Sequence, residues 1–159
     1  MDFLSKSLKK IFKIFGLLKK EGTVILAGLD NAGKASLMSL IQYNEIRPFD
    51  PTLYTLPAEV KIGDLEVKSI ELGGLNLVLK VWRDYYPKVD AIIYLMDAAD
   101  PKRFSENRKE FEGIVSAPGL GNIPILLLGN KIDKVITEFD ILVQFIGDQS
   151  HSSIFQFFP

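Results

Sequence analysis

The chain has 159 residues, of which 47% are hydrophobic and 25% charged, so it can bury one core and is neither disordered nor repetitive in composition. It contains no cysteine, which excludes a disulfide framework and fits a reducing compartment. No stretch reaches the ~20 apolar residues that a transmembrane helix needs. The net charge of −1 combines a basic segment at residues 1 to 20, with six lysines and one aspartate, and a more acidic remainder.

Residues 1 to 21 are predicted to form an amphipathic helix. At about 100° per residue the apolar side chains fall on one face and the lysines on the other. The two faces hold Leu4, Leu8, Ile11, Phe12, Phe15 and Leu18, and Lys6, Lys9, Lys10, Lys13 and Lys20. Such a helix can lie in a membrane interface, or it can fold back on its own domain. A signal peptide is disfavoured because recurring lysines leave no long apolar run.

The next segment predicts a strand, a glycine-rich loop and a helix. Residues 23 to 27 are apolar and β-branched, and residues 35 to 43 have helical spacing. Between them, residues 28 to 35 match the phosphate-binding pattern G-x-x-x-x-G-K-[ST], except that Ala35 replaces the Ser or Thr that binds magnesium. A chance glycine turn is the alternative, and the flanking strand and helix disfavour it.

This loop is the candidate phosphate site. Backbone N–H groups of residues 31 to 36 would converge on a β-phosphate, and Lys34 would reach between the β- and γ-phosphates. The candidate nucleotide-binding residues here are Asp30, Asn31, Ala32, Gly33, Lys34, Ala35 and Ser36.

Further along the chain, strands are predicted at 58 to 62 and 65 to 72, joined by a hairpin turn at Gly63 and Asp64. Residues 91 to 96 form another apolar run that indicates a buried strand ending at Asp97. A helix is expected from about Arg103 to Val115.

A second motif, Asn130-Lys-Ile-Asp133, follows the apolar run 123 to 128 and therefore sits at the carboxyl end of a strand, where open α/β sheets bind ligands. The Asp133 carboxylate can accept hydrogen bonds from guanine N1–H and its exocyclic amine, whereas adenine has no matching pair of donors. Asn130 and Lys131 would brace the loop and the ring. Alone the motif could be a polar turn, but downstream of a phosphate loop it indicates guanine.

These motifs together resemble a small GTPase of the Arf superfamily, and specifically its Sar branch. The resemblance covers residues 1 to about 147, and Asp2 rules out the myristoyl anchor of Arf proper, which needs a glycine there. The matching positions are residues 28 to 34, 51 to 53, 72 to 74, 81 and 82, Tyr85, Pro87 and 127 to 133. The resemblance implies an α/β fold of the P-loop GTPase type, with three α/β/α layers, a mostly parallel sheet and five strands ordered 2-3-1-4-5.

The resemblance also assigns GTP or GDP and Mg²⁺ as cofactors, and roles to further residues. Thr52 falls in the first switch loop, where it would sense magnesium and the γ-phosphate, although a plain turn Thr after Pro is the alternative. Gly74 would offer its N–H to the γ-phosphate. Glu71 stands where the family has an Asp that holds the metal's water shell, and Leu75 where Sar proteins have the His that positions the attacking water. With Ala35 and Leu75 in place, we expect GTP hydrolysis to be impaired.

The C-terminal part departs from the family. A helix is predicted at 138 to 146, and the few residues that follow are too short for both a last strand and a covering helix, so we expect a fold truncated at the C-terminus that lacks both, in a GTPase domain of residues 22 to 159. The tail at 153 to 158 could still pair as a replacement edge strand. A truncated or altered reading frame is an open alternative. His151 is expected to be a solvated loop residue.

By resemblance, the function is that of a membrane-recruited GTP-binding switch in vesicle transport from endoplasmic reticulum to Golgi, on the cytosolic face of those membranes. The alternative is a non-hydrolysing or defective relative that uses the same surfaces. Partners would be coat proteins, an exchange factor and a GTPase-activating protein, with the aromatic segment around Trp82 as a partner contact and residues 1 to 20 as the membrane contact. We expect a monomer and no nucleic-acid partner.

Overall fold

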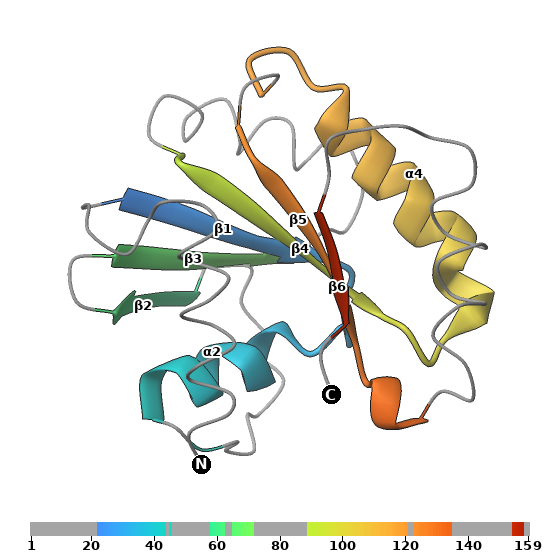
Figure 1. Ribbon diagram of the computed structural model, residues 1–159, viewed down its shortest axis with the longest axis horizontal. Helices are drawn as coiled ribbons and strands as arrows, with labels where there is room; N and C mark the ends of the chain where they lie inside the picture. Colours follow the sequence, from blue (N-terminus) through green and yellow to red (C-terminus); the bar gives the residue numbers. More distant parts are fainter. Residues whose placement is uncertain are drawn as a thin grey trace.

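The computed structural model describes residues 22–43, 45, 58–62, 65–71, 89–120, 123–134 and 154–157, and these build one six-stranded sheet (Figure 1). The strand order is β2-β3-β1-β4-β5-β6. The pairing of β2 with β3 is antiparallel and the other four pairings are parallel, which confirms the predicted order of the first five strands. The strands are β1 (Gly22–Gly28), β2 (Ala58–Ile62), β3 (Leu65–Glu71), β4 (Ala91–Asp97), β5 (Ile125–Asn130) and β6 (Ile154–Phe157).

Two α-helices are described, α2 (Lys34–Tyr43) and α4 (Phe104–Val115). Figure 1 shows them on opposite sides of the sheet, so the predicted three-layer α/β/α arrangement is confirmed. Short 3₁₀ turns, η3 (Pro101–Arg103) and η4 (Ile132–Lys134), precede α4 and follow β5. Both turns lie next to the candidate site.

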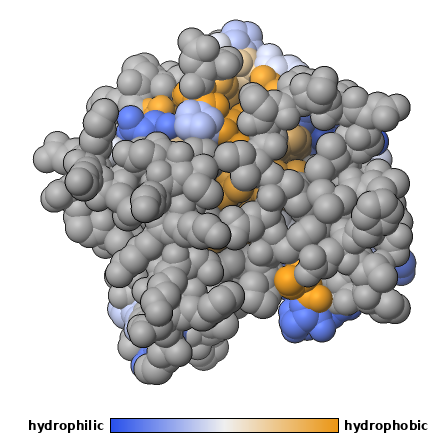
Figure 2. Space-filling view, viewed as in Figure 1, coloured by the Kyte–Doolittle hydropathy of each residue, from blue (hydrophilic) through white to orange (hydrophobic). Residues whose placement is uncertain are grey.

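The core follows from the two-residue period of the buried parallel strands. Ile25, Ile92 and Tyr94 point to the face that packs against Phe104 and Ile114 of α4. The intervening residues of β1 and β4 are equally buried and point to the face that carries α2. In the view of Figure 2, the described hydrophobic residues are visible mainly in the upper central part, where hydrophilic residues border them. The strands that lead to the site are therefore anchored on both faces.

The end of the chain supplies the replacement edge strand that its sequence allowed. β6 pairs in parallel with β5, with Ile154 opposite Leu126 and Phe157 opposite Gly129. A short apolar segment with β-branched and aromatic residues has high strand propensity, and the free edge of β5 offers unpaired backbone groups. The tail thus completes the edge of the sheet beside β5.

Strand β5 begins two residues later than predicted and extends through Asn130. Pro124 lacks an N–H and cannot donate to the ladder, although its carbonyl accepts from the N–H of Ile92 at 3.0 Å. Consequently the first residue of the guanine motif is itself the last residue of the strand.

Several predictions concern residues outside the described ranges: the helix at 1 to 21, Thr52, Gly74, Leu75, the segment around Trp82, the helix at 138 to 146 and His151. Glu71 ends β3, but its side chain is not described. Within the described part of the chain, no helix combines the length and the hydropathy that crossing a bilayer requires.

Candidate nucleotide-binding site

The glycine-rich loop lies between β1 and α2, at the carboxyl edge of the parallel strands. The ends of β4 and β5 reach the same edge, because Asp97 is in register with Asn130 across that pair. At the other side of β1, Gly28 is in register with Glu71, which places the end of β3 beside the start of the loop. Open α/β sheets bind ligands at this edge.

Two glycines of the loop are required by its geometry. Gly33 has φ +99°, and a Cβ there would collide with the side chain of Asn130. Gly28 has φ +150°, and a Cβ would collide with the backbone carbonyl of Leu95. Asn31 adopts the left-handed region at φ 59°, which Asn tolerates better than most residues. The loop is therefore fitted tightly between β4 and β5.

Lys34 is the buried cation of the loop, with 4% of its surface exposed. Its Nζ donates to the carbonyl oxygens of Gly28 at 2.9 Å and Leu29 at 2.6 Å. A buried ammonium without such partners would be costly. The loop thus holds a desolvated positive charge at the N-terminus of α2, where the helix dipole also favours an anion. This arrangement fits the phosphates of a nucleotide.

The second motif makes direct contact with the phosphate loop. Asn130 Nδ2 donates to the carbonyl of Ala32 at 2.9 Å, and Lys131 Nζ donates to the carbonyl of Asn31 at 2.8 Å. Lys131 also forms an ion pair of 2.7 Å with Asp97 at the end of β4. Lys131 has φ 63°, a strained conformation for a residue with a side chain, and such strain is common at functional sites.

Asp133 lies in η4 and is exposed, so its carboxylate is accessible to a base. The structure therefore brings the phosphate loop and the guanine motif into one site, and the residues present fit a guanine nucleotide.

Position 35, where the phosphate-loop pattern has the Ser or Thr that binds magnesium, offers no metal ligand. Ala35 begins the first turn of α2 after Lys34 and is exposed, and its methyl group cannot bind a cation. Ser36 is also exposed, but it lies about 100° further round the helix. Within the described ranges, no group of three His, Cys, Asp or Glu side chains could hold a metal ion. At position 35 the donor set does not fit Mg²⁺.

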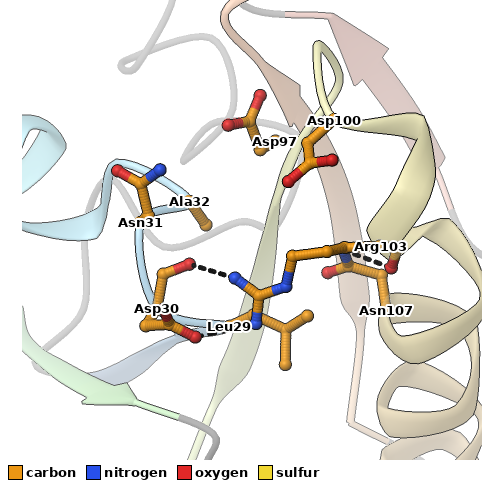
Figure 3. A pocket seen from close by; sticks show the side chains of 8 residues that line it. All are labelled: Leu29, Asp30, Asn31, Ala32, Asp97, Asp100, Arg103 and Asn107. Atoms are coloured by element: carbon orange, nitrogen blue, oxygen red, sulfur yellow. Dashed lines mark hydrogen bonds and ion pairs between the residues drawn. The ribbon is translucent and has the colours of Figure 1, made fainter.

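A small pocket adjoins the loop on the side of α4 (Figure 3). Its lining comes from the loop, the end of β4 and the start of α4: Leu29, Asp30, Asn31, Ala32, Asp97, Asp100, Arg103 and Asn107. Arg103 Nη2 forms an ion pair of 2.7 Å with Asp30 Oδ1.

Sequence reasoning assigned no site role to Arg103, Asp97 or Asn107. Asp97 could have been suspected because it ends a buried strand at the ligand edge. Arg103 and Asn107 carry no local signal, since charged and amide residues at the start of an amphipathic helix are ordinary.

Comparison with known proteins agrees with this geometry. The model of the ADP-ribosylation factor family matches residues 8–140. The chain is 33% identical over 142 residues to the small COPII coat GTPase SAR1 of Giardia intestinalis, covering 89% of this chain and 74% of the relative. It is 40% identical over 125 residues to SAR1 of Nicotiana tabacum, with 79% and 63% covered. It is also 37% identical over 136 residues to ADP-ribosylation factor-like protein 8b of Arabidopsis thaliana, with 84% and 70% covered. The chain belongs to the ADP-ribosylation factor family of small GTPases, as a Sar-type member.

Proposed function

We propose that this protein is a guanine-nucleotide-dependent switch that is recruited to membranes in vesicle transport between endoplasmic reticulum and Golgi. The observation that carries the proposal is the joint phosphate and base site, in which Asn130 and Lys131 hold the carbonyls of Ala32 and Asn31 while Lys34 lies buried beneath the loop. The transport role is supported by the similarity to two relatives described as COPII coat GTPases.

In this proposal, Lys34 and the loop N–H groups bind the phosphates and Asp133 selects guanine. Mg²⁺ would neutralise phosphate charge when bound, with Thr52 and a water held by Glu71 as its remaining contacts, because position 35 offers no oxygen. Gly74 would contact the γ-phosphate, and Leu75 could not orient a water. Hydrolysis would then depend on a partner such as a GTPase-activating protein.

The residues 1 to 20 would contact the cytosolic surface of the membrane through their apolar and lysine faces. Coat proteins and an exchange factor would bind the switch surfaces, including the segment around Trp82.

The first experiment analyses the nucleotide content of the purified full chain and then measures single-turnover hydrolysis with magnesium. Bound GDP or GTP with slow phosphate release supports the switch. Bound GTP that releases no phosphate, even when an extract containing coat proteins is added, would support the non-hydrolysing alternative. A folded chain that carries no nucleotide would overturn a nucleotide-driven function.

The second experiment measures sedimentation with vesicles that contain about one fifth anionic lipid. Deletion of residues 1 to 20 is expected to abolish binding, because it removes both the apolar and the cationic face. Equal binding of the deletion variant would refute the membrane role of this segment.

A further inference from the structure

The guanidinium of Arg103 contacts the tip of the phosphate loop through two of its nitrogens. Nη2 donates to Asp30 Oδ1 at 2.7 Å, and Nη1 donates to the backbone carbonyl of Asp30 at 3.2 Å (Figure 3). These residues are 73 positions apart in the sequence. One side chain thus engages both the carboxylate and the backbone of a single loop residue.

Arg103 is itself held in place from α4. Its Nε donates to Glu106 Oε2 at 2.8 Å, and its backbone carbonyl accepts from Asn107 Nδ2 at 3.0 Å. Asn107 is 2% exposed and accepts hydrogen bonds of 3.1 Å from the hydroxyl of Tyr94 in the core. These contacts restrict the conformations of Arg103 before it binds the loop. Binding Asp30 therefore costs it less conformational entropy than it would cost a mobile surface arginine.

The Asp30 carboxylate is a negative charge on a loop whose ligand is also negative. The hydrogen bond from Arg103, helped by the charges of Arg103 and Lys34, lowers the pKa of Asp30, so the carboxylate is ionised at neutral pH. Three further carboxylates lie nearby, on Asp97, Asp100 and Glu106. Since like charges repel, an unneutralised Asp30 would oppose the phosphates, and most strongly the ligand with the most phosphate charge.

We infer that Arg103 is a positioning residue for the phosphate loop, which neutralises Asp30 and fixes its backbone so that the loop accepts a polyphosphate. The inference rests on the proposed nucleotide-binding function. An exposed ion pair with a negligible effect is the plain alternative, because most such pairs contribute little. If Arg103 positions the loop, its removal weakens nucleotide binding more as the number of phosphates rises, and only while Asp30 carries its charge. If the ion pair has a negligible effect, its removal changes no dissociation constant.

The test uses the full chain and measures dissociation constants for GMP, GDP and a non-hydrolysable GTP analogue at low and high salt. Arg103→Ala is expected to raise the dissociation constant about tenfold for the GTP analogue, about threefold for GDP and less than twofold for GMP. These factors are expected to be smaller at high salt. In an Asp30→Asn background the same substitution is expected to change each constant less than twofold, because no carboxylate remains to be neutralised.

Arg108→Ala is the matched control. Arg108 lies in α4, the helix that follows Arg103, and pairs with Glu112 at 3.9 Å outside the pocket lining, so its removal is expected to leave all three constants unchanged. Arg103→Gln, which keeps donors but loses the charge, is expected to show the same dependence on phosphate number. It serves as the second variant if the alanine variant unfolds at a lower temperature.

Equal losses for all three nucleotides, no loss, or an undiminished loss in the Asp30→Asn background would overturn the inference while leaving nucleotide binding intact. A wild-type chain that binds no GDP would instead overturn the proposed function, and the inference with it.

Discussion

The side-chain amide of Asn130 donates a hydrogen bond of 2.9 Å to the backbone carbonyl of Ala32, across 98 positions of sequence. The same amide occupies the space that a Cβ on Gly33 would need. The guanine motif and the phosphate loop are therefore packed against each other, and a change in one is expected to disturb the other.

Gly33→Ala is expected to weaken GDP binding by at least a hundredfold. The substitution forces a Cβ into Asn130 and places a side-chain residue at φ +99°, so both the hydrogen bond to Ala32 and the loop conformation are lost. Isothermal titration of the nucleotide-free variant with GDP checks this.

Gly119→Ala is the control for that variant. Gly119 has a similar φ of +94° but lies in the turn after α4, so its substitution carries comparable backbone strain without touching the loop. We expect a loss of stability of about 1 kcal/mol and unchanged GDP affinity. If both variants lose affinity equally, the effect of Gly33 is a general loss of folding rather than a change in the site.

Ala35→Thr is expected to slow GDP dissociation roughly tenfold in magnesium and to leave the rate in EDTA unchanged. The hydroxyl restores the oxygen that the phosphate-loop pattern places on the metal. Ala35→Val has nearly the same shape without the hydroxyl and should behave as wild type. A slower rate in the valine variant, or one that persists in EDTA, would contradict the metal-ligand explanation. Fluorescent GDP displacement gives the rates.

Glu110→Gln is expected to stabilise the protein at pH 7 by about 1 kcal/mol. Glu110 is 8% exposed and, within the described part of the chain, its Oε2 has no hydrogen-bond partner. Burial raises the pKa of Glu110. The charge of Lys109 lowers that pKa, and the charge of Glu106 raises it further.

The direction in which stability changes with pH follows from proton linkage. The folded state binds the Glu110 proton more tightly than the unfolded state, so the wild-type stability is full below the ordinary Glu pKa and falls as pH rises through the folded pKa. The variant should lack this fall. Urea denaturation between pH 4 and pH 8 checks it, with the exposed Glu112→Gln as control, and a variant that runs parallel to wild type would contradict the prediction.

Tyr94→Phe is expected to destabilise the protein by about 1 to 2 kcal/mol. The change removes the hydrogen bonds from the buried hydroxyl to Asn107 O and Oδ1 but keeps the edge-to-face ring contact with Phe111 at 5.3 Å. In an Asn107→Ala background the cost should fall, because one of the two acceptors is already gone. Chemical denaturation of the four proteins measures this, and an equal cost in both backgrounds would refute the coupling.

Much of the fold could be predicted from local patterns. The apolar run 91 to 96 became β4, the pair of runs on either side of Gly63 became β2 and β3, and the strand, loop and helix around Lys34 lie as expected. The tail that became β6 could be named only as a possible edge strand, because four residues of strand propensity carry little signal until a partner edge is available.

The sequence by itself determined the family, the phosphate loop with its missing hydroxyl at Ala35, and the Asn130-Lys-Ile-Asp133 motif from which guanine is predicted. These depend on residue types at fixed spacing, and spacing is visible in a sequence. Only the tertiary structure decided that Asn130 braces Ala32, that Lys131 joins Asn31 to Asp97, and that Arg103 neutralises Asp30. Such contacts join segments up to 100 positions apart, and their geometry exists only once the parallel strands have brought their ends to one edge of the sheet.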